Sequence, residues 1–108
     1  MFIINKELIK GSTVTIILNA LKKEPLYGYG MIKEIENKSN GVFLFKEGTL
    51  YPILHELEKK DLIESFWNVE NGRRRKYYKI TSKGLKELKL RESEWKIFSK
   101  TMDFVLGV

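Results

Sequence analysis

Hydrophobic residues recur at helical spacing over most of the chain. Residues 5–23 read as a first helix and residues 29–38 as a second, because apolar side chains return three and four positions apart. Pro25 ends the first helix, since the residue before a proline is displaced from helical backbone angles. Asn40-Gly41 ends the second, because Gly accepts the left-handed conformation that closes a helix. Residues 26–30 between them predict a turn, and residues 42–45 either a short strand or an extended link.

A third helix begins near Gly48 and closes at Lys59-Lys60-Asp61. One of its faces is apolar at spacings of three and four, with Leu50, Ile53, Leu54 and Leu57. The opposite face carries Thr49, Tyr51, Pro52, His55, Glu56 and Lys59. The pattern predicts a helix with one buried side and one exposed, polar side.

The pattern then changes to that of a β-hairpin. Residues 62–69 form a first strand run, Glu70-Asn71-Gly72 is a turn cluster, and residues 76–80 form a second strand rich in β-forming residues. Four consecutive cations lie between the turn and the second strand: Arg73, Arg74, Arg75 and Lys76. The hairpin is therefore expected to have a basic tip.

One long helix is predicted from Ser82 to about Leu106, with the Thr81 hydroxyl as its N-cap. Its apolar residues stand at seven-residue intervals, except where Arg91 occupies the equivalent place. They are Leu88, Trp95 and Met102, with Phe98 and Val105 three positions on. Because the preceding domain is built from residues up to 81, this stripe is left over, and a partner is the simplest way to bury it.

The element order predicts a mostly α fold with a small β-hairpin, a winged helix-turn-helix with a long C-terminal dimerisation helix. Residues 1–81 form the DNA-binding domain and residues 82–108 the dimerisation helix, together one compact unit. A helix suits the DNA major groove, and a basic wing reaches phosphates or the minor groove. The candidate DNA-binding residues are Lys46, Thr49, Tyr51, His55, Asn71, Arg73, Arg74, Arg75 and Lys76.

Some of these residues could serve only in packing. Tyr51 could pack under the wing instead of contacting DNA, and strand alternation could send Arg75 back against the domain to pair with a carboxylate. Trp67, Tyr77 and Tyr78 are interpreted as hairpin and core packing. A tryptophan on a dimer seam, such as Trp95, is often only part of that interface.

Composition narrows the classes of function. The chain has 108 residues and a formal net charge of +6, and five cations with no acid fall between Arg73 and Lys79, which favours a polyanionic partner. Zero cysteines and one histidine exclude disulfides, thiolate catalysis and His- or Cys-rich metal sites, so no cofactor or metal is expected. No apolar run approaches the roughly 20 residues that span a bilayer. Without a signal peptide as well, a cytoplasmic protein is predicted.

Several motifs in combination resemble PadR-type bacterial transcriptional regulators, over nearly the whole chain. In the third helix they are Gly48-Thr49-Leu50-Tyr51-Pro52 with Leu54, Leu57, Glu58, Leu62 and Ile63; elsewhere they are Tyr27-Gly28-Tyr29, the wing segment from Gly72 to Tyr78, and Thr81 with Gly84. A single C-terminal helix resembles the short, LmrR-like subclass. The sequence departs from the family where His55 or Glu56 replaces a frequent arginine and Asp61 replaces a glycine.

The resemblance implies a homodimeric repressor that binds a palindromic operator in double-stranded DNA and releases it on binding a small molecule. In the LmrR-like subclass a tryptophan of the C-terminal helices accepts planar aromatic compounds, and Trp95 stands at the equivalent place. The alternative is a winged-helix docking module that binds protein and not DNA. An enzyme is the least supported class, because paired titratable groups for turnover are missing from the sequence.

Overall fold

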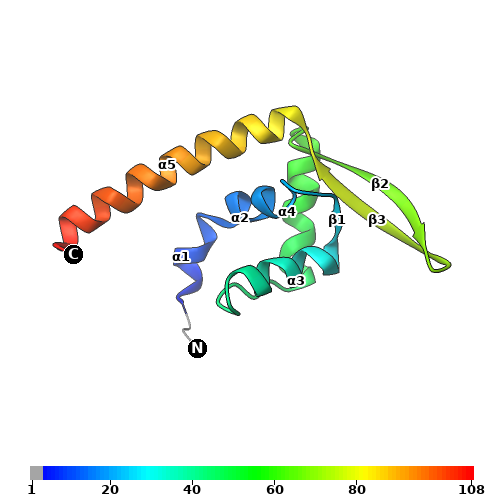
Figure 1. Ribbon diagram of the computed structural model, residues 1–108, viewed down its shortest axis with the longest axis horizontal. Coiled ribbons are helices and arrows are strands. Elements are labelled where there is room, and N and C mark those ends of the chain that lie inside the picture. Colours follow the sequence, from blue (N-terminus) through cyan, green and yellow to red (C-terminus); the bar gives the residue numbers. More distant parts are fainter. Residues whose placement is uncertain (1–3) are drawn as a thin grey trace.

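The computed structural model describes residues 4–108 as five helices and three strands. The helices are α1 (Lys6–Lys10), α2 (Thr13–Ala20), α3 (Gly28–Lys38), α4 (Glu47–Lys59) and α5 (Ser82–Leu106); the strands are β1 (Leu26–Tyr27), β2 (Ile63–Glu70) and β3 (Arg73–Ile80). The molecule measures 55 × 32 × 22 Å. Figure 1 shows why it is elongated: α5 runs past the helical body toward one end, and the β2–β3 hairpin projects from the other.

The core lies where α2, α3 and α4 meet the start of α5 and the base of the hairpin. The predicted apolar face of α4 is confirmed, because Leu50 and Leu54 are 0% exposed and Leu57 is 3% exposed. Ile53 is partly buried at the margin of the same cluster. The remaining buried apolar residues are Ile17, Leu18, Ala20, Leu21, Met31, Ile32, Ile35, Leu62, Ile63, Tyr78 and Leu88. Burial of one side of α4 leaves its other side free.

The first predicted helix is interrupted and shorter than expected. Gly11 and Ser12 separate α1 from α2, because a glycine and a serine at adjacent positions disfavour helix continuation. Helix α2 ends at Ala20, three positions before the predicted Lys23. The chain then reverses so that Leu26 and Tyr27 pair with β3.

The sheet has three antiparallel strands in the order β1-β3-β2, one more than the predicted hairpin. Strand β1 pairs Leu26 with Tyr78 and Tyr27 with Tyr77, so a segment expected to be a turn is a two-residue edge strand. Two residues are too few for alternation to be visible in the sequence. Of the alternatives for residues 42–45, the structure has an irregular link.

The second hairpin strand begins earlier than predicted, at Arg73 and not at Lys76. Asn71 (φ 52°) and Gly72 (φ 74°) both have positive φ, the backbone of a two-residue type I′ turn. This turn allows pairing to start at once, with Glu70 opposite Arg73. The four consecutive cations are therefore part of the strand, and their side chains alternate between two faces.

The predicted N-cap of the last helix is confirmed. The Thr81 hydroxyl accepts a hydrogen bond from the Gly84 amide at 3.0 Å and so caps α5. Asp61 has φ 60°, the left-handed conformation for which glycine is favoured, and Asp tolerates it better than most residues. None of the helices in the described part of the chain is both long enough and apolar enough to cross a membrane.

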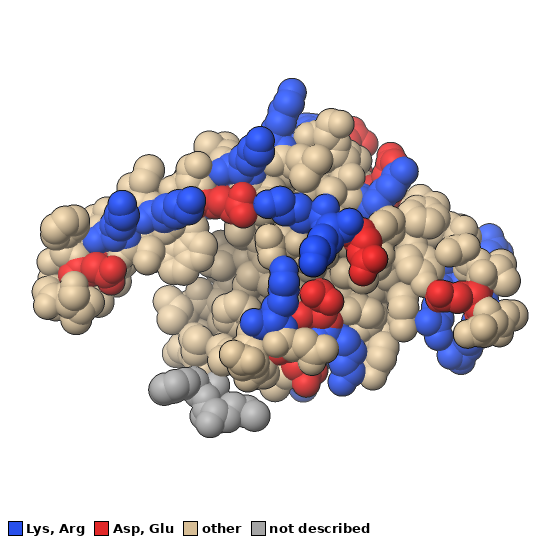
Figure 2. Space-filling model, in the orientation of Figure 1, with Lys and Arg blue, Asp and Glu red and all other residues tan. Residues whose placement is uncertain are grey.

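Charged side chains are spread along the molecule. In the view of Figure 2, Lys and Arg side chains follow α5 over much of its length, with acidic side chains interspersed. The net charge therefore does not identify a binding face by itself.

Candidate nucleic-acid interface

The exposed side of α4 is the first part of the candidate interface. Thr49 and His55 are exposed on it, and Lys46 precedes its first turn as the N-cap residue with extended backbone angles. The Lys46 carbonyl accepts from the Thr49 and Leu50 amides at 3.0 and 2.9 Å, which fixes the start of the helix. The N-terminal residues of a recognition helix are the ones that meet base edges. Thr49 is placed in that part of the helix.

Tyr51 has both a structural and an exposed side. Its hydroxyl end packs against Gly28 at the start of α3 so closely that a Cβ at position 28 would overlap it. The side chain nevertheless remains 43% exposed. Tyr51 thus packs against the start of α3, and part of its ring stays available to a partner.

The wing, defined as the β2–β3 hairpin, is the second part. Antiparallel pairing places residues directly opposite one another on the same face. The inner face, on the side of α4 and the core, carries Ile63, Ser65, Trp67, Val69, Arg74, Lys76, Tyr78 and Ile80; the outer face carries Glu64, Phe66, Asn68, Glu70, Arg73, Arg75, Tyr77 and Lys79. Ser65 ties the inner face to α4, since its hydroxyl donates to the Glu58 carboxylate at 2.5 Å.

Cations on the outer face are largely engaged within the protein. Lys79 Nζ lies 3.1 Å from a Glu64 oxygen, and the Arg75 guanidinium lies 4.4 Å from the centroid of the Tyr27 ring. Arg75 does turn back against the domain, but its partner is an aromatic ring and not the carboxylate that the sequence suggested. Stacking of this kind suits the planar guanidinium. Arg75 therefore fastens the wing to β1.

A hydrogen bond near the turn changes the ionisation of Tyr77 on the same face. The Tyr77 hydroxyl donates to Glu70 Oε2 at 2.7 Å. That hydrogen bond, followed by partial burial, raises the pKa of Tyr77 above its ordinary value of 10.0. Burial likewise raises the pKa of Tyr78 on the inner face. Both phenols are neutral at physiological pH, and the predicted packing role of Tyr77 and Tyr78 is confirmed by their ring and core contacts.

The inner face differs from the outer face in the exposure and pairing of its cations, in the half of the hairpin that projects from the core. Arg74 and Lys76 are exposed there, and within residues 4–108 neither takes part in an ion pair. Each lies over an aromatic ring instead: Arg74 is 4.5 Å from the Trp67 ring centroid, and Lys76 is 5.7 Å from that of Tyr78. The two acids of the hairpin strands, Glu64 and Glu70, are both on the other face. Arg74 and Lys76 therefore lie on the side of α4, on the opposite face from both hairpin carboxylates.

Asn71 and Arg73 occupy the end of the wing. Asn71 is the first turn residue, and Arg73 is the outer-face cation opposite Glu70. The sequence treated the four cations as one group, whereas the structure separates Arg74 and Lys76 from Arg73 and Arg75. Trp67 is the residue that sequence reasoning placed only in hairpin packing. The signal that would have found it is the Asn71-Gly72 turn, which sets the register that places Trp67 opposite Lys76.

The second half of α5 exposes the predicted dimerisation seam. Trp95, Phe98, Met102 and Val105 are 50, 55, 39 and 76% exposed, and the Trp95 and Phe98 ring centroids lie 5.7 Å apart. Leu88 differs, because it is 1% exposed and belongs to the core of its own protomer. A side chain that is already buried is not available to a second copy, so Leu88 is removed from the predicted seam. Trp95 also lines a mainly apolar hollow of about 300 Å³ with residues of α2, α3 and α5, Phe43 and Ser39.

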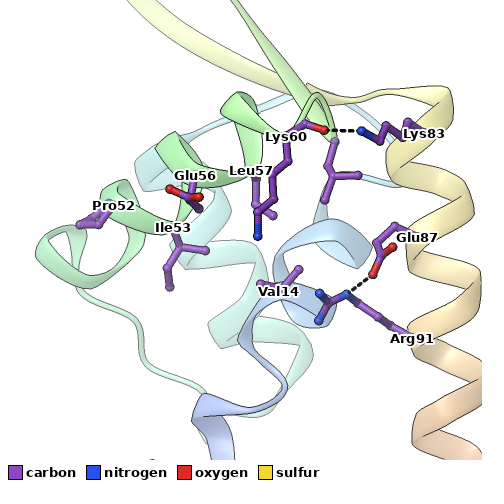
Figure 3. Close-up of a pocket in the computed structure, with 10 residues that line it drawn as sticks. Val14, Pro52, Ile53, Glu56, Leu57, Lys60, Lys83, Glu87 and Arg91 are labelled. Atoms are coloured by element: carbon purple, nitrogen blue, oxygen red, sulfur yellow. Dashed lines mark hydrogen bonds and ion pairs between the residues drawn. The ribbon is translucent and has the colours of Figure 1, made fainter.

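A second hollow is lined in part by Arg91, the residue that interrupts the heptad pattern. Figure 3 shows it between α4, α2 and α5, with charged side chains at its margins. Arg91 Nε lies 2.7 Å from a Glu87 oxygen, one helical turn away, and Lys83 Nζ donates to the Lys60 carbonyl at 2.9 Å. The hollow has a volume of about 630 Å³ and an apolar floor that includes Val14 and Leu57. Arg91 thus pairs within its own helix.

An exposed helix beside a basic hairpin, followed by a long helix, defines the winged helix-turn-helix class. Residues 17–90 match the model of the transcriptional regulator PadR-like family. A solved transcriptional regulator from Clostridium thermocellum is 37% identical, with a TM-score of 0.83 over 90% of this chain and 95% of its own. The chain belongs to the PadR-like family of transcriptional regulators, and this membership implies DNA binding.

Two further relatives extend over the same length. A solved PadR family transcriptional regulator from Eggerthella lenta is 31% identical, with a TM-score of 0.83 over 94% of this chain and 87% of its own. A protein of Lysinibacillus sphaericus is 36% identical over 104 residues, 95% of each chain. The likeness therefore includes the C-terminal helix as well as the winged domain. Membership of the LmrR-like subclass stays a prediction.

Proposed function

We propose that the chain is a dimeric repressor that binds a specific palindromic operator in double-stranded DNA. Helix α4 enters the major groove with Thr49 and His55 toward the base edges, and the wing lies on the adjacent backbone with Arg74 and Lys76 toward phosphates. The observation that carries this proposal is that two exposed wing cations, Arg74 and Lys76, lie on the face of the wing that Ser65 ties to α4. A duplex would be contacted by both at once.

Dimerisation through α5 is supported by the seam of four exposed apolar residues. Burying apolar surface stabilises an interface by about 25 cal/mol per Å² before the costs of association. A two-fold dimer presents two identical winged modules, so its operator is palindromic, with half-sites about 34 Å apart along the duplex. Because the two linked modules bind one operator, the dimer also binds it more tightly than a single module would.

A planar aromatic ligand at Trp95 is the proposed releasing signal. Support comes from the position of the half-exposed indole beside an apolar hollow whose volume of about 300 Å³ is at the lower end for small-molecule sites. Such a ligand changes DNA affinity only if it binds one spacing of the two modules better than the other. In a Trp67→Phe variant, Trp95 is the remaining tryptophan, and the absence of any fluorescence change with planar aromatics would contradict this assignment.

The repressor proposal is tested by electrophoretic mobility shift with DNA from upstream of the gene, over a salt series. The variants are Arg74→Ala/Lys76→Ala on the inner face and, as the matched control, Arg73→Ala on the outer face. We expect a specific shift that weakens steeply with salt, with a slope reduced by about 2 in the double variant. Arg73→Ala is expected to have the smaller effect, because it removes one cation, from the outer face, where Glu70 lies opposite it.

Other outcomes separate the alternatives. Equal shifts with specific and random DNA would mean that the operator lies elsewhere. No shift at low salt would favour the alternative, a winged-helix module that docks on protein. A regulator of chromosomal DNA acts in the cytoplasm, which is the location we propose, and it requires no cofactor for binding.

A further inference from the structure

Trp67 is an exposed aromatic residue on the inner face of the wing. It is 56% exposed, whereas Ile63 at the base of the same face is 1% exposed. The indole therefore contributes little to the protein core. Any role of the indole must therefore come from its contacts on the face of the hairpin.

The register of the hairpin brings Trp67 between two cations. Lys76 lies directly opposite it, and Arg74, which is opposite Val69, is its diagonal neighbour. The Arg74 guanidinium lies over the indole ring, 4.5 Å from its centroid. Trp67 and Arg74 thus form a stacked pair at the projecting end of the inner face.

Stacking orients a guanidinium without using its hydrogen-bond donors. The five N–H groups lie in the guanidinium plane, so a group that is stacked flat on a ring still presents them at its edge. An unstacked arginine samples many rotamers, and ordering it on DNA costs conformational entropy. An arginine held on a ring in advance loses less freedom when it meets a phosphate.

The other arginine–ring pair of the wing does not have this position. Arg75 stacks at 4.4 Å over Tyr27, on the outer face, where it is partly buried against β1. The lysine on that face, Lys79, is 6.0 Å from the Phe66 ring and is paired with Glu64. The Trp67–Arg74 pair differs from both, because it is exposed and faces the side of α4.

We propose that Trp67 is a positioning residue for DNA binding, whose indole holds the Arg74 guanidinium on the inner face so that its edge meets a backbone phosphate. This inference rests on the proposed DNA-binding function and adds a residue to it. Trp67 acts through Arg74 and not by reading bases. The effect is on affinity for any duplex, because phosphate contacts carry no sequence information.

A double-mutant cycle tests the proposal. Operator affinity is measured for the wild type, Trp67→Leu, Arg74→Ala and the combined variant over a salt series. We expect Trp67→Leu to weaken binding about threefold to tenfold, the effect of disordering one long side chain. In the Arg74→Ala background, Trp67→Leu should have no further effect, because the group that it positions is gone. Trp67→Phe should restore part of the affinity, since a phenyl ring also accepts a stacked guanidinium.

Phe66→Leu is the matched control. It removes an aromatic ring from the adjacent residue of the same strand, on the outer face, where Phe66 stacks with Tyr77 at 5.8 Å. Its DNA affinity should equal that of the wild type once circular dichroism shows that both variants are folded. An equal loss in both variants would mean that the hairpin fold, and not Arg74, is affected.

Two results would overturn the positioning role. One is an unchanged affinity of Trp67→Leu alongside a weakened Arg74→Ala, and the other is an additive loss in the combined variant, which would make Trp67 an independent contact. The proposed function fails in a different way, through a wild-type protein that does not shift operator DNA at all.

Discussion

The wing and the second half of α5 both project from the core, at opposite ends of the molecule, and they expose opposite chemistry (Figure 1). The projecting half of the wing carries cations beside aromatic rings, and its inner-face cations have no carboxylate partner. The end of α5 exposes apolar side chains, up to 86% for Phe104. The two elements that project from the core are therefore suited to different partners.

The two elements are suited to their partners in different ways. A polyanion is matched by charge held at a fixed register, which the turn of the wing provides. The proposed second copy of the chain would be matched by apolar area, which the seven-residue spacing of α5 provides. Both elements start from one junction, where Leu62, Thr81 and Gly84 meet.

The largest effect is expected from a charge in the apolar element. Phe98→Asp places a carboxylate in the seam, so the dimer dissociates and operator affinity falls by about 100-fold or more as the two modules bind separately. Light scattering after size exclusion measures the dimer, and mobility shift measures the affinity. Ile97→Asp is the control, because Ile97 is 68% exposed but faces away from the seam. A dimeric Phe98→Asp, or an equal loss in both variants, would contradict the seam.

The junction is expected to be the next most sensitive position. In Gly84→Ala the added Cβ would overlap the Leu62 carbonyl oxygen and the Ile80 side chain, which destabilises the fold by about 1–3 kcal/mol. Urea unfolding measures the change. Gly48→Ala in α4 is the opposite case, since its Cβ would meet nothing within 4 Å. It should stabilise the fold by roughly 0.5–1 kcal/mol, because alanine has the better helix propensity. If both variants changed the free energy of unfolding in the same direction, this role of the junction would be refuted.

A third prediction distinguishes the base contacts expected of α4 from the phosphate contacts expected of the wing. Thr49→Ala should lower the preference for operator over random DNA by about 1–3 kcal/mol, because a lost base contact affects only the specific site. Lys76→Ala should weaken both DNAs alike and reduce the salt slope by about 1. Competition binding with the two DNAs distinguishes these outcomes. A uniform loss in Thr49→Ala would instead identify Thr49 as a phosphate contact.

The smallest effect concerns the outer face of the wing at high pH. Since the folded state raises the pKa of Tyr77 above 10.0, its contribution is fully present below pH 10 and is lost as the pH rises through the raised value. Thermal unfolding of the wild type should therefore show declining stability above pH 10. The decline should be shallower in Tyr77→Phe, which lacks the hydroxyl that donates to Glu70. The same profile in both proteins would show that this hydrogen bond contributes nothing to stability.

The sequence by itself determined the elements that local chemistry controls. The spacing of Leu50, Leu54 and Leu57 predicted which side of α4 is buried, since a helix has a fixed period. The Thr81 cap and the stop at Asn40-Gly41 are also local, because the first depends on a side-chain acceptor and the second on the backbone preferences of Asn and Gly. The order of these elements was sufficient to predict the winged helix-turn-helix.

Only the tertiary structure decided which side chains are free to bind. Strand alternation divides residues between two faces, but the pairing register and the packing of the sheet on α4 decide that Arg74 faces the same side as α4 while Arg75 stacks on Tyr27. The short strand β1 and the burial of Leu88 also depend on segments far apart in the chain. Contacts over such distances are set by the whole core, so a local pattern cannot specify them.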